Sequence, residues 1–403
     1  MTTGFSKKRL TICMLTGRPA EDLPTGRASA GWLFFRLVVN PRRLDENCAS
    51  TRSLKEDPVA PEPTCISRRR FLHYAGVSSA ILGFGAPARA AAKTEVSMRL
   101  DWLFQGPNAG FMVAKDKGYY DKAGLDVTIG AGRGSGSTAQ IIASKTAMIG
   151  FSDGYVVGNT VAKGASIRMV AAIYRRNPTA IVVLADSDIK NPRDLEGKSV
   201  GMPAGGAPFQ QWPAFAKGCG VDAAKVQIVN VDPAGAPPAL ITGKVPAISG
   251  YAQGFVPMIE IRGNKKARIF WFADCAVTAI SNGIIVHNDL LKENPGVIRE
   301  FVAASLRGFL DARRNPDEAV AIVKKFSDAV EPAIARREME LSWATWVTPN
   351  TEGKPLGWMS DKDWEATVET LRQYGGVTTP LEARQLYTND FIPTGAEFIP
   401  PRA

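Results

Sequence analysis

The fold is decided by residues 96–151, VSMRLDWLFQGPNAGFMVAKDKGYYDKAGLDVTIGAGRGSGSTAQIIASKTAMIGF. Short β-branched or apolar runs in this stretch alternate with stretches of helical character. The expected strands are 97–100, 127–129 and 148–151, and the expected helices are 109–120 and 138–145. Such alternation is typical of βαβ units, in which helices join parallel strands. The sequence therefore predicts an α/β protein with a mostly parallel sheet.

The alternation continues to residue 286 and then stops. Further strands are expected at 168–173, 181–185, 199–202, 226–231, 247–250, 268–272 and 283–286. From Pro295 onward, apolar residues such as Ile298, Phe301 and Phe309 recur at helical spacing, which predicts a helix with one buried face. Another helix is expected at 361–374, capped by Ser360 or Asp361. A chain of this length can form two medium-sized domains, and the pattern favours two.

A basic cluster and an apolar run precede the α/β region. The sequence SRRRFL at 67–72 is followed by a glycine-diluted apolar run at 75–86 and by ARA at 88–90. A twin arginine, a weakly apolar segment and an Ala-x-Ala site are typical of a Tat export signal. We predict a signal peptide at 67–90 built around Arg68 and Arg69, a disordered extension or misassigned start at 1–66, and a mature protein exported to the periplasm.

Positive charge is concentrated in this leader. Residues 1–90 hold 14 of the 49 Lys and Arg residues but 7 of the 39 Asp and Glu residues, so residues 91–403 carry only +3 of the formal charge of +10. A nucleic-acid or anionic-membrane partner would need a basic patch on the folded domain. We therefore expect no nucleic-acid partner and no direct contact with a membrane surface.

Two of the five cysteines, Cys219 and Cys275, lie after residue 90. Two cysteines do not make a disulfide framework. An oxidising periplasm would allow them to pair, but the sequence does not place them within bonding distance. We expect two separate buried thiols.

Several motifs in a fixed order resemble a known family. They are LDW at 100–102, GFMVAK at 110–115, GYY at 118–120, AGLDV at 123–127, GRGSGS at 132–137 and NPRDLEGKSVG at 191–201. Over about residues 96–328 the chain resembles the periplasmic solute-binding proteins of the nitrate, sulfonate, taurine and thiamine-pyrimidine-precursor type. These proteins in turn resemble the thiamine pyrimidine synthases.

The resemblance implies a bilobed periplasmic-binding-protein fold, type II-like, with a ligand cleft between two α/β lobes. Two crossover hinges are expected near 181–185 and 281–286. Lobe 1 would comprise 91–184 plus 283–403 with the C-terminal helices, and lobe 2 would comprise 185–282. The implied partners are a small-molecule ligand and the permease and ATPase of an ABC transporter, with membrane contact only through the permease. We expect a monomer with no cofactor and no metal.

Candidate ligand-binding residues lie where predicted strands end, because open α/β sheets bind ligands at the carboxyl ends of their strands. The glycine-rich run 130–138 follows a strand and opens a helix, so its amides can approach a ligand, and Ser135 and Ser137 can cap the helix. Aromatic and amide side chains suit an N-heterocycle such as a thiamine pyrimidine precursor, an aromatic acid or an alkanesulfonate. The candidates are Trp102, Gln105, Asn108, Arg133, Ser135, Gly136, Ser137, Ser152, Asp153, Tyr174, Gly205, Gln210, Gln211, Trp212 and Tyr251.

Three alternatives to a binding protein stay open. A thiamine pyrimidine synthase-like enzyme would need a lysine, a histidine and a cysteine run, but the matching positions hold Ser152, Val156 and a single Cys275. A serine hydrolase is suggested by GFSDG at 150–154, which matches the Gly-x-Ser-x-Gly elbow, although His287 is the sole histidine after residue 90. The third alternative is a ligand-sensing domain without a transporter. We expect a protein that is not an enzyme.

Overall fold

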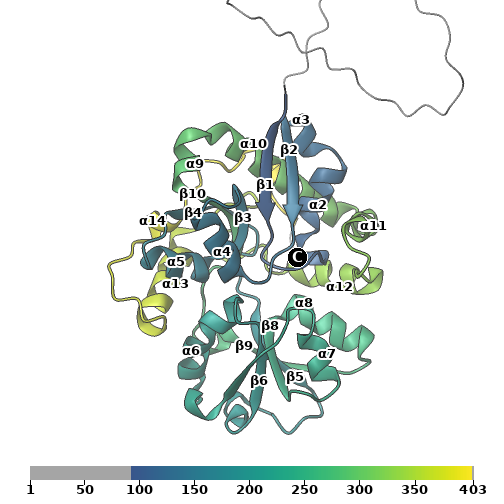
Figure 1. Cartoon of the computed structure of the whole chain (residues 1–403), viewed down its shortest axis with the longest axis vertical. Helices are drawn as coiled ribbons and strands as arrows, with labels where there is room; N and C mark the ends of the chain where they lie inside the picture. Colours follow the sequence, from purple (N-terminus) through teal and green to yellow (C-terminus); the bar gives the residue numbers. More distant parts are fainter. Residues whose placement is uncertain (1–91, 402–403) are drawn as a thin grey trace, which may run out of the picture. The chain divides into compact units, whose positions relative to one another are not determined.

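The computed structural model describes residues 92–401 (Figure 1). The predicted signal peptide with Arg68 and Arg69, and the extension at 1–66, lie outside the described residues. Within 92–401, no helix combines the length and the apolar character that crossing a bilayer requires.

The first of two five-stranded sheets has the strand order β2-β1-β3-β10-β4. Its strands are β1 (Thr94–Arg99), β2 (Leu125–Gly130), β3 (Ile149–Asp153), β4 (Ile167–Ala172) and β10 (Asn282–His287). β1 pairs in parallel with β2 and β3, whereas β10 runs antiparallel between β3 and β4. The antiparallel strand is the one on which the chain returns from the second sheet.

The second sheet has the order β7-β6-β8-β5-β9. Its strands are β5 (Thr179–Leu184), β6 (Ser199–Met202), β7 (Gln227–Asn230), β8 (Ala247–Tyr251) and β9 (Ala267–Trp271). β6 pairs in parallel with β7 and β8, and β5 runs antiparallel to β8 and β9. In both sheets, the strand that arrives from the other sheet is therefore antiparallel to its neighbours.

Helices pack around both sheets (Figure 1). With the first sheet lie α2 (Ala109–Asp116), α3 (Tyr119–Lys122), α4 (Ser135–Ala143), α5 (Gly154–Ala162), α9 (Asn288–Glu293), α10 (Pro295–Arg314), α11 (Pro316–Phe326), α12 (Pro332–Trp343), α13 (Asp361–Tyr374) and α14 (Ala383–Leu386). With the second sheet lie α6 (Ala207–Cys219), α7 (Ala236–Ile241) and α8 (Ala252–Pro257), followed by the π-helical turn η4 (Met258–Arg262). The apolar stripe of α10 supplies Phe301 and Phe309 to an aromatic cluster around Phe111, as its helical spacing predicts.

The strand pattern predicted from the sequence is confirmed, because each of the ten described strands overlaps an expected one within three residues at either end. The helix expected at 109–120 is divided, because α2 ends at Asp116 and Gly118, with a φ of 68°, is the N-cap of α3. The helix expected from 138 begins at Ser135 instead. Ser360 is the N-cap of α13, but its side chain makes no capping hydrogen bond.

The first crossing between the sheets lies earlier than the sequence indicated. We expected lobe 1 to extend to residue 184, but β5 belongs to the second sheet, so the chain crosses between β4 and Thr179. It returns between β9 and Asn282. The apolar run at 181–183 identifies a buried strand but not the sheet that it joins. We propose lobe 1 as 92–178 plus 281–401, and lobe 2 as 179–280.

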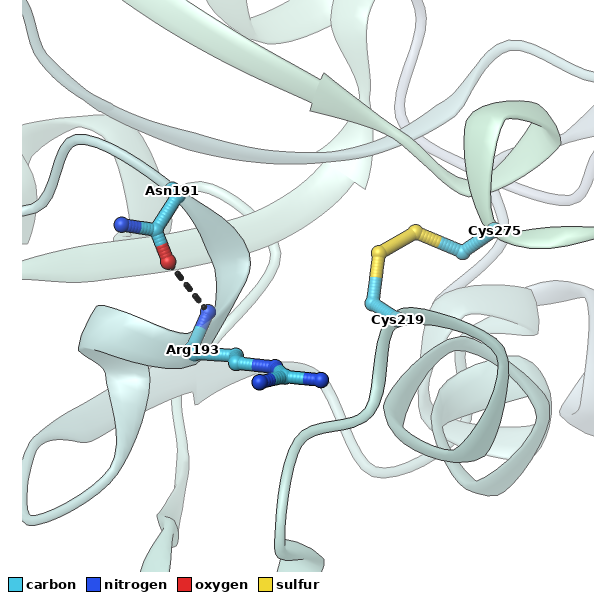
Figure 2. The surroundings of a disulfide bond; sticks show 4 residues. All are labelled: Asn191, Arg193, Cys219 and Cys275. Carbon is cyan, nitrogen blue, oxygen red and sulfur yellow. Dashed lines mark hydrogen bonds between the residues drawn. A yellow bond between two sulfur atoms is a disulfide. The ribbon is translucent and has the colours of Figure 1, made fainter.

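Cys219 and Cys275 form a disulfide bond within lobe 2, with their Cα atoms 5.0 Å apart (Figure 2). The expectation of two separate thiols is therefore wrong. The two residues are 56 positions apart, but Cys219 ends α6 and Cys275 ends the 3-10 helix η5 (Phe272–Cys275), and these helices share an apolar cluster. Phe215 stacks on Phe272 with ring centroids 4.5 Å apart. Packing of these rings brings the sulfur atoms together.

Replacing both cysteines with serine is expected to lower the free energy of unfolding by about 2–4 kcal/mol, because a cross-link over this span restricts the unfolded chain. Guanidinium unfolding followed by tryptophan fluorescence measures the change. Dithiothreitol should lower the stability of the unmodified protein by a similar amount and leave the double variant unaffected. An equal effect of dithiothreitol on both proteins would contradict a stabilising disulfide.

Candidate ligand-binding site

A small cavity lies where strands of both sheets end. Its wall is formed by the segments that follow β1, β2, β6 and β8, and its volume is about 40 Å³. The residues of lobe 1 in this wall include Asp101, Trp102 and Ser135, and those of lobe 2 include Tyr251 and Phe255. This is the position at which open α/β sheets present ligand-binding groups.

The two lobes make direct hydrogen bonds beside the cavity. The amide of Gly136, in the first turn of α4, donates to the carbonyl of Gly205 at 2.9 Å. Asn159 Nδ2 donates to Gln210 Oε1 at 2.8 Å. A Cβ at Gly136 would lie 2.7 Å from the Gln210 amide, so glycine permits this close approach. The glycine-rich loop therefore joins the lobes.

The predicted capping of α4 by serine side chains is wrong. The N-cap is Gly134, which has no side chain to form a capping hydrogen bond, and the helix begins at Ser135. Ser137 Oγ donates to the carbonyl of Gly134 at 2.8 Å. The Gly136 amide, expected to face a ligand, is occupied by lobe 2.

A buried carboxylate, Asp153, joins both lobes behind the cavity-lining residue Tyr251. It caps α5, and its Oδ1 accepts from the amides of Tyr155 and Val156 and from Gln211 Nε2 at 3.1 Å. Its Oδ2 accepts from the hydroxyls of Tyr251 and Ser281, each at 3.0 Å. Gln211 and Tyr251 belong to lobe 2, so one carboxylate connects α5, α6, β8 and the segment that enters β10.

A second buried carboxylate, Asp101, faces the cavity. Its Oδ2 accepts from Asn282 Nδ2 at 2.7 Å. Its Oδ1 is buried and accepts no hydrogen bond of good geometry from the described residues. Asp101 is 6% exposed and lines the cavity. A buried acceptor without a donor is costly, so a bound molecule that brought a donor to Oδ1 would relieve this cost.

Burial raises the pKa of three carboxyl groups in this region. The pKa of Asp153 is raised to about 6 and that of Asp101 to about 7, although hydrogen bonds from Tyr251 and Asn282 respectively oppose the change. The nearby charge of Asp153 adds to the shift of Asp101. Burial also raises the pKa of Glu338, on α12, to about 8, opposed by the amide of Gly106, which donates to it at 3.0 Å. At pH 7, Glu338 is therefore mostly protonated and Asp101 about half protonated, whereas Asp153 is mostly ionised.

Stability is expected to fall as the pH rises from 5 to 8.5. The folded-state pKa values of Asp153, Asp101 and Glu338 lie above the unfolded values, so their contribution is complete below about pH 4 and disappears as the pH passes through 6 to 8. Each group contributes at most about 1.4 kcal/mol per pH unit while only the folded state holds its proton. Differential scanning calorimetry across this range measures the decline. Glu338→Gln should flatten it between pH 6 and 8, and a melting temperature that rises with pH would contradict the assignment.

Comparison with protein families adds to this geometry. The family model described as NMT1/THI5 like matches residues 106–319, more than half of the chain. The chain belongs to the NMT1/THI5-like family. The resemblance inferred from the ordered motifs is thereby confirmed.

Two curated proteins are similar to this NMT1/THI5-like chain over most of their length. The riboflavin-binding protein RibY of Chloroflexus aurantiacus is 27% identical over 319 residues, covering 77% of this chain and 90% of that protein. The formylaminopyrimidine-binding protein of Halalkalibacterium halodurans is 26% identical over 303 residues, covering 73% of this chain and 89% of that protein.

Solved structures establish the fold. The alkanesulfonate-binding protein SsuA from Xanthomonas axonopodis pv. citri, bound to MOPS, has a TM-score of 0.59 at 13% identity and covers 74% of this chain and 100% of its own. A Candida albicans gene product described as having the generic periplasmic binding protein fold has a TM-score of 0.54 at 16% identity, covering 74% of this chain and 96% of its own. The predicted periplasmic-binding-protein fold is confirmed.

The predicted site residues of this NMT1/THI5-like chain fall into three groups according to their position relative to the cavity. Those that line the cavity are Trp102, Gln105, Ser135 and Tyr251. Those in the contacts around it are Gly136, Ser137, Ser152, Asp153, Gly205, Gln210 and Gln211. Asn108 also belongs to the contacts around the cavity, because a hydrogen bond from its side chain opposes the rise in the pKa of Asp101. Those outside these contacts are Arg133, Tyr174 and Trp212, of which Arg133 is exposed, Tyr174 donates to the carbonyl of Pro107, and Trp212 stacks on Phe215.

Asp101 and Phe255 are among the residues of the cavity wall that sequence reasoning did not select. Asp101 belongs to the LDW motif, and a carboxylate directly after a predicted strand is the signal that points to it. Phe255 packs over Gly250, where a Cβ would collide with its ring. The Gly250-Tyr251 pair gives a weak indication of this aromatic contact.

The hydrolase alternative does not fit the position of Ser152. This residue lies within β3 rather than at a sharp turn, is fully buried, and donates to the carbonyl of Ser135 at 3.0 Å. Gly283 of β10 pairs with Ser152, whereas His287 lies at the other end of β10. There His287 caps α9, its Nδ1 accepting from the amide of Asp289. Ser152 and His287 therefore do not form a catalytic pair.

Proposed function

We propose that this protein is the periplasmic solute-binding component of an ABC importer, and that it captures an N-heterocycle and delivers it to a permease and its ATPase. The observation that carries the proposal is the buried carboxyl of Asp101, which lines the cavity beside aromatic side chains and whose Oδ1 accepts no hydrogen bond of good geometry within the described residues. The names of the riboflavin-binding and formylaminopyrimidine-binding relatives support a heterocyclic ligand. The protein acts as a monomer, without a cofactor and without catalysing a reaction.

The chemistry of the wall favours a ring that carries N–H groups. A carboxylate accepts hydrogen bonds, and Trp102, Tyr251 and Phe255 offer aromatic surface against which a flat ring can pack. Among the described residues that line the cavity, none is a lysine or an arginine. A sulfonate or carboxylate ligand would meet the negative charge of Asp101 without a cation to balance it. Of the three ligand classes expected from the sequence, the N-heterocycle therefore fits best.

Capture requires the lobes to move apart. A cavity of about 40 Å³ holds a few water molecules at roughly 10–15 Å³ each, not a heteroaromatic ring. The crossings before Thr179 and before Asn282 are the segments at which the lobes can rotate. Contacts such as Gly136 to Gly205 form on closure, and a ligand that touches both lobes stabilises the closed form.

A thermal-shift experiment tests the function. The protein is heated with riboflavin, an aminopyrimidine, benzoate or butanesulfonate, and a ligand at 100 times its dissociation constant adds about 2.7 kcal/mol of stability. We expect at least one heterocycle to raise the melting temperature, and neither anion to do so. A shift by butanesulfonate or benzoate alone would overturn the ligand class, and no shift by any compound would overturn the binding function.

Asp101→Asn is expected to weaken binding of the heterocycle about 10- to 100-fold, because a hydrogen bond to a charged acceptor contributes about 1.5–3 kcal/mol and the amide can turn a donor toward the ring. In the unmodified protein, affinity should rise as Asp101 ionises near pH 7, and the variant should lose this dependence. Isothermal titration calorimetry from pH 5.5 to 8.5 measures both effects. Equal affinities and equal pH profiles would remove Asp101 from the site.

A further inference from the structure

A second and larger chamber adjoins the cleft cavity. Its volume is about 460 Å³, more than ten times that of the cavity. Four residues line both spaces, two from the segment after β1 and two from α8: Trp102, Gln105, Gly254 and Phe255. Single side chains therefore separate the cavity from the chamber, so a ligand held in one lies next to the other.

We propose that the ligand has two parts, a flat N-heterocycle held beside Asp101 and an uncharged, hydroxylated chain held in this second chamber. The inference rests on the proposed function and deepens it, because it adds a subsite that selects among heterocycles.

The passage between the two spaces is open at Gly254. A Cβ placed there would meet only the Gln105 amide, at 3.6 and 3.8 Å. That amide makes no hydrogen bond within residues 92–401, and it borders both spaces. An amide with a free donor and a free acceptor suits a hydroxyl group, which can both donate and accept.

The chamber wall combines apolar side chains with a smaller number of polar ones. Phe104, Met258 and Ile334 supply apolar surface for the carbon atoms of a chain. The carboxyl of Glu338 faces the same chamber and is buried. Since burial raises the pKa of Glu338 to about 8, the group is protonated at pH 7 and does not repel an uncharged chain.

The charged residues of the chamber are already paired. Arg262, in η4 of lobe 2, donates from Nε to Glu331 Oε1 at 2.8 Å, and Glu331 is the N-cap of α12 in lobe 1. No other lysine or arginine lines the chamber among the described residues. A phosphorylated chain would therefore have to share Arg262 with Glu331, which weakens its attraction to this cation and favours a chain without charge.

Flavins of matched structure test the proposal, because riboflavin carries a hydroxylated chain, lumiflavin has a methyl group in its place, and flavin mononucleotide adds a phosphate. We expect riboflavin to bind about 10-fold or more tightly than lumiflavin, and more tightly than flavin mononucleotide, as measured by quenching of flavin fluorescence. Equal affinities for riboflavin and lumiflavin would overturn the chain subsite. Tighter binding of flavin mononucleotide would overturn its uncharged character.

Two variants locate the effect. Gln105→Ala removes the amide, and Ala234→Trp enlarges an exposed alanine of the chamber wall. Each variant should reduce the preference for riboflavin over lumiflavin about 10-fold. Ala224→Trp, at an exposed alanine of lobe 2 that does not line the chamber, is the matched control and should leave the preference unchanged. An unchanged preference in both test variants would overturn the placement. If an aminopyrimidine binds but no flavin does, this inference fails and the proposed function stands.

Discussion

Trp102→Ala is expected to weaken ligand binding about 100-fold, a loss of about 2.7 kcal/mol. Trp102 lines both the cavity and the larger chamber, and it packs from lobe 1 against the apolar cluster of lobe 2 around Phe255 and Val256. Its ring therefore contributes to the surface that holds the heterocycle and to the contact that closes the lobes. Isothermal titration calorimetry with the best ligand of the thermal-shift panel measures the change.

Trp271→Ala is the matched control for this variant. Trp271 ends β9, is 37% exposed and does not line the cavity or the adjoining chamber. We expect its replacement to leave the affinity within about two-fold, since surface substitutions change free energies by about 0.5 kcal/mol or less. Equal losses in the two variants, or an unchanged affinity in Trp102→Ala, would contradict the position of the site.

Asp153→Ala is expected to lower the free energy of unfolding by about 3–5 kcal/mol, because several buried donors would all lose the same hydrogen-bond acceptor. The affected donors are the amides of Tyr155 and Val156, Gln211 Nε2, and the hydroxyls of Tyr251 and Ser281. Urea unfolding followed by circular dichroism measures the loss. The ligand should also bind more weakly, because Gln211 and Tyr251 connect the carboxylate to lobe 2.

Asp222→Ala provides the control for Asp153. Asp222 caps the 3-10 helix η3 (Ala223–Lys225) at an exposed position, where it accepts from the amide of Ala224. Losing this exposed cap should cost about 1 kcal/mol or less. A cost for Asp153→Ala no larger than that of Asp222→Ala would show that the buried network does not stabilise the fold.

The strands and the class of fold could be predicted because they depend on local patterns. Apolar runs of four to six residues between helical stretches identify strands irrespective of their neighbours. The sheet to which each strand belongs was harder to predict, because the run at 181–183 has the same apolar character whether it joins the first sheet or the second. Pairing with β8 and β9 places it in the second.

Candidate site residues were predictable where a side chain lies at the carboxyl end of a strand or in the segment that follows it. Tyr251 ends β8, Trp102 and Gln105 lie in the segment after β1, and all three line the cavity. The role of the glycine-rich loop was not predictable, because its amides have a partner only once α4 of lobe 1 faces Gly205 of lobe 2. The same holds for the cysteines, whose sulfur atoms meet through the packing of Phe215 on Phe272.

The sequence by itself determined the strand and helix pattern, the family resemblance and the region of the cleft, because these follow from periodicity and from short motifs along the chain. Only the tertiary structure decided which groups meet. One oxygen of Asp101 is buried without a hydrogen-bond partner, and Asp153 accepts hydrogen bonds from four elements. These arrangements depend on contacts between segments up to 181 residues apart. Burial and hydrogen bonding depend on neighbours in space, and the order of residues does not specify these neighbours.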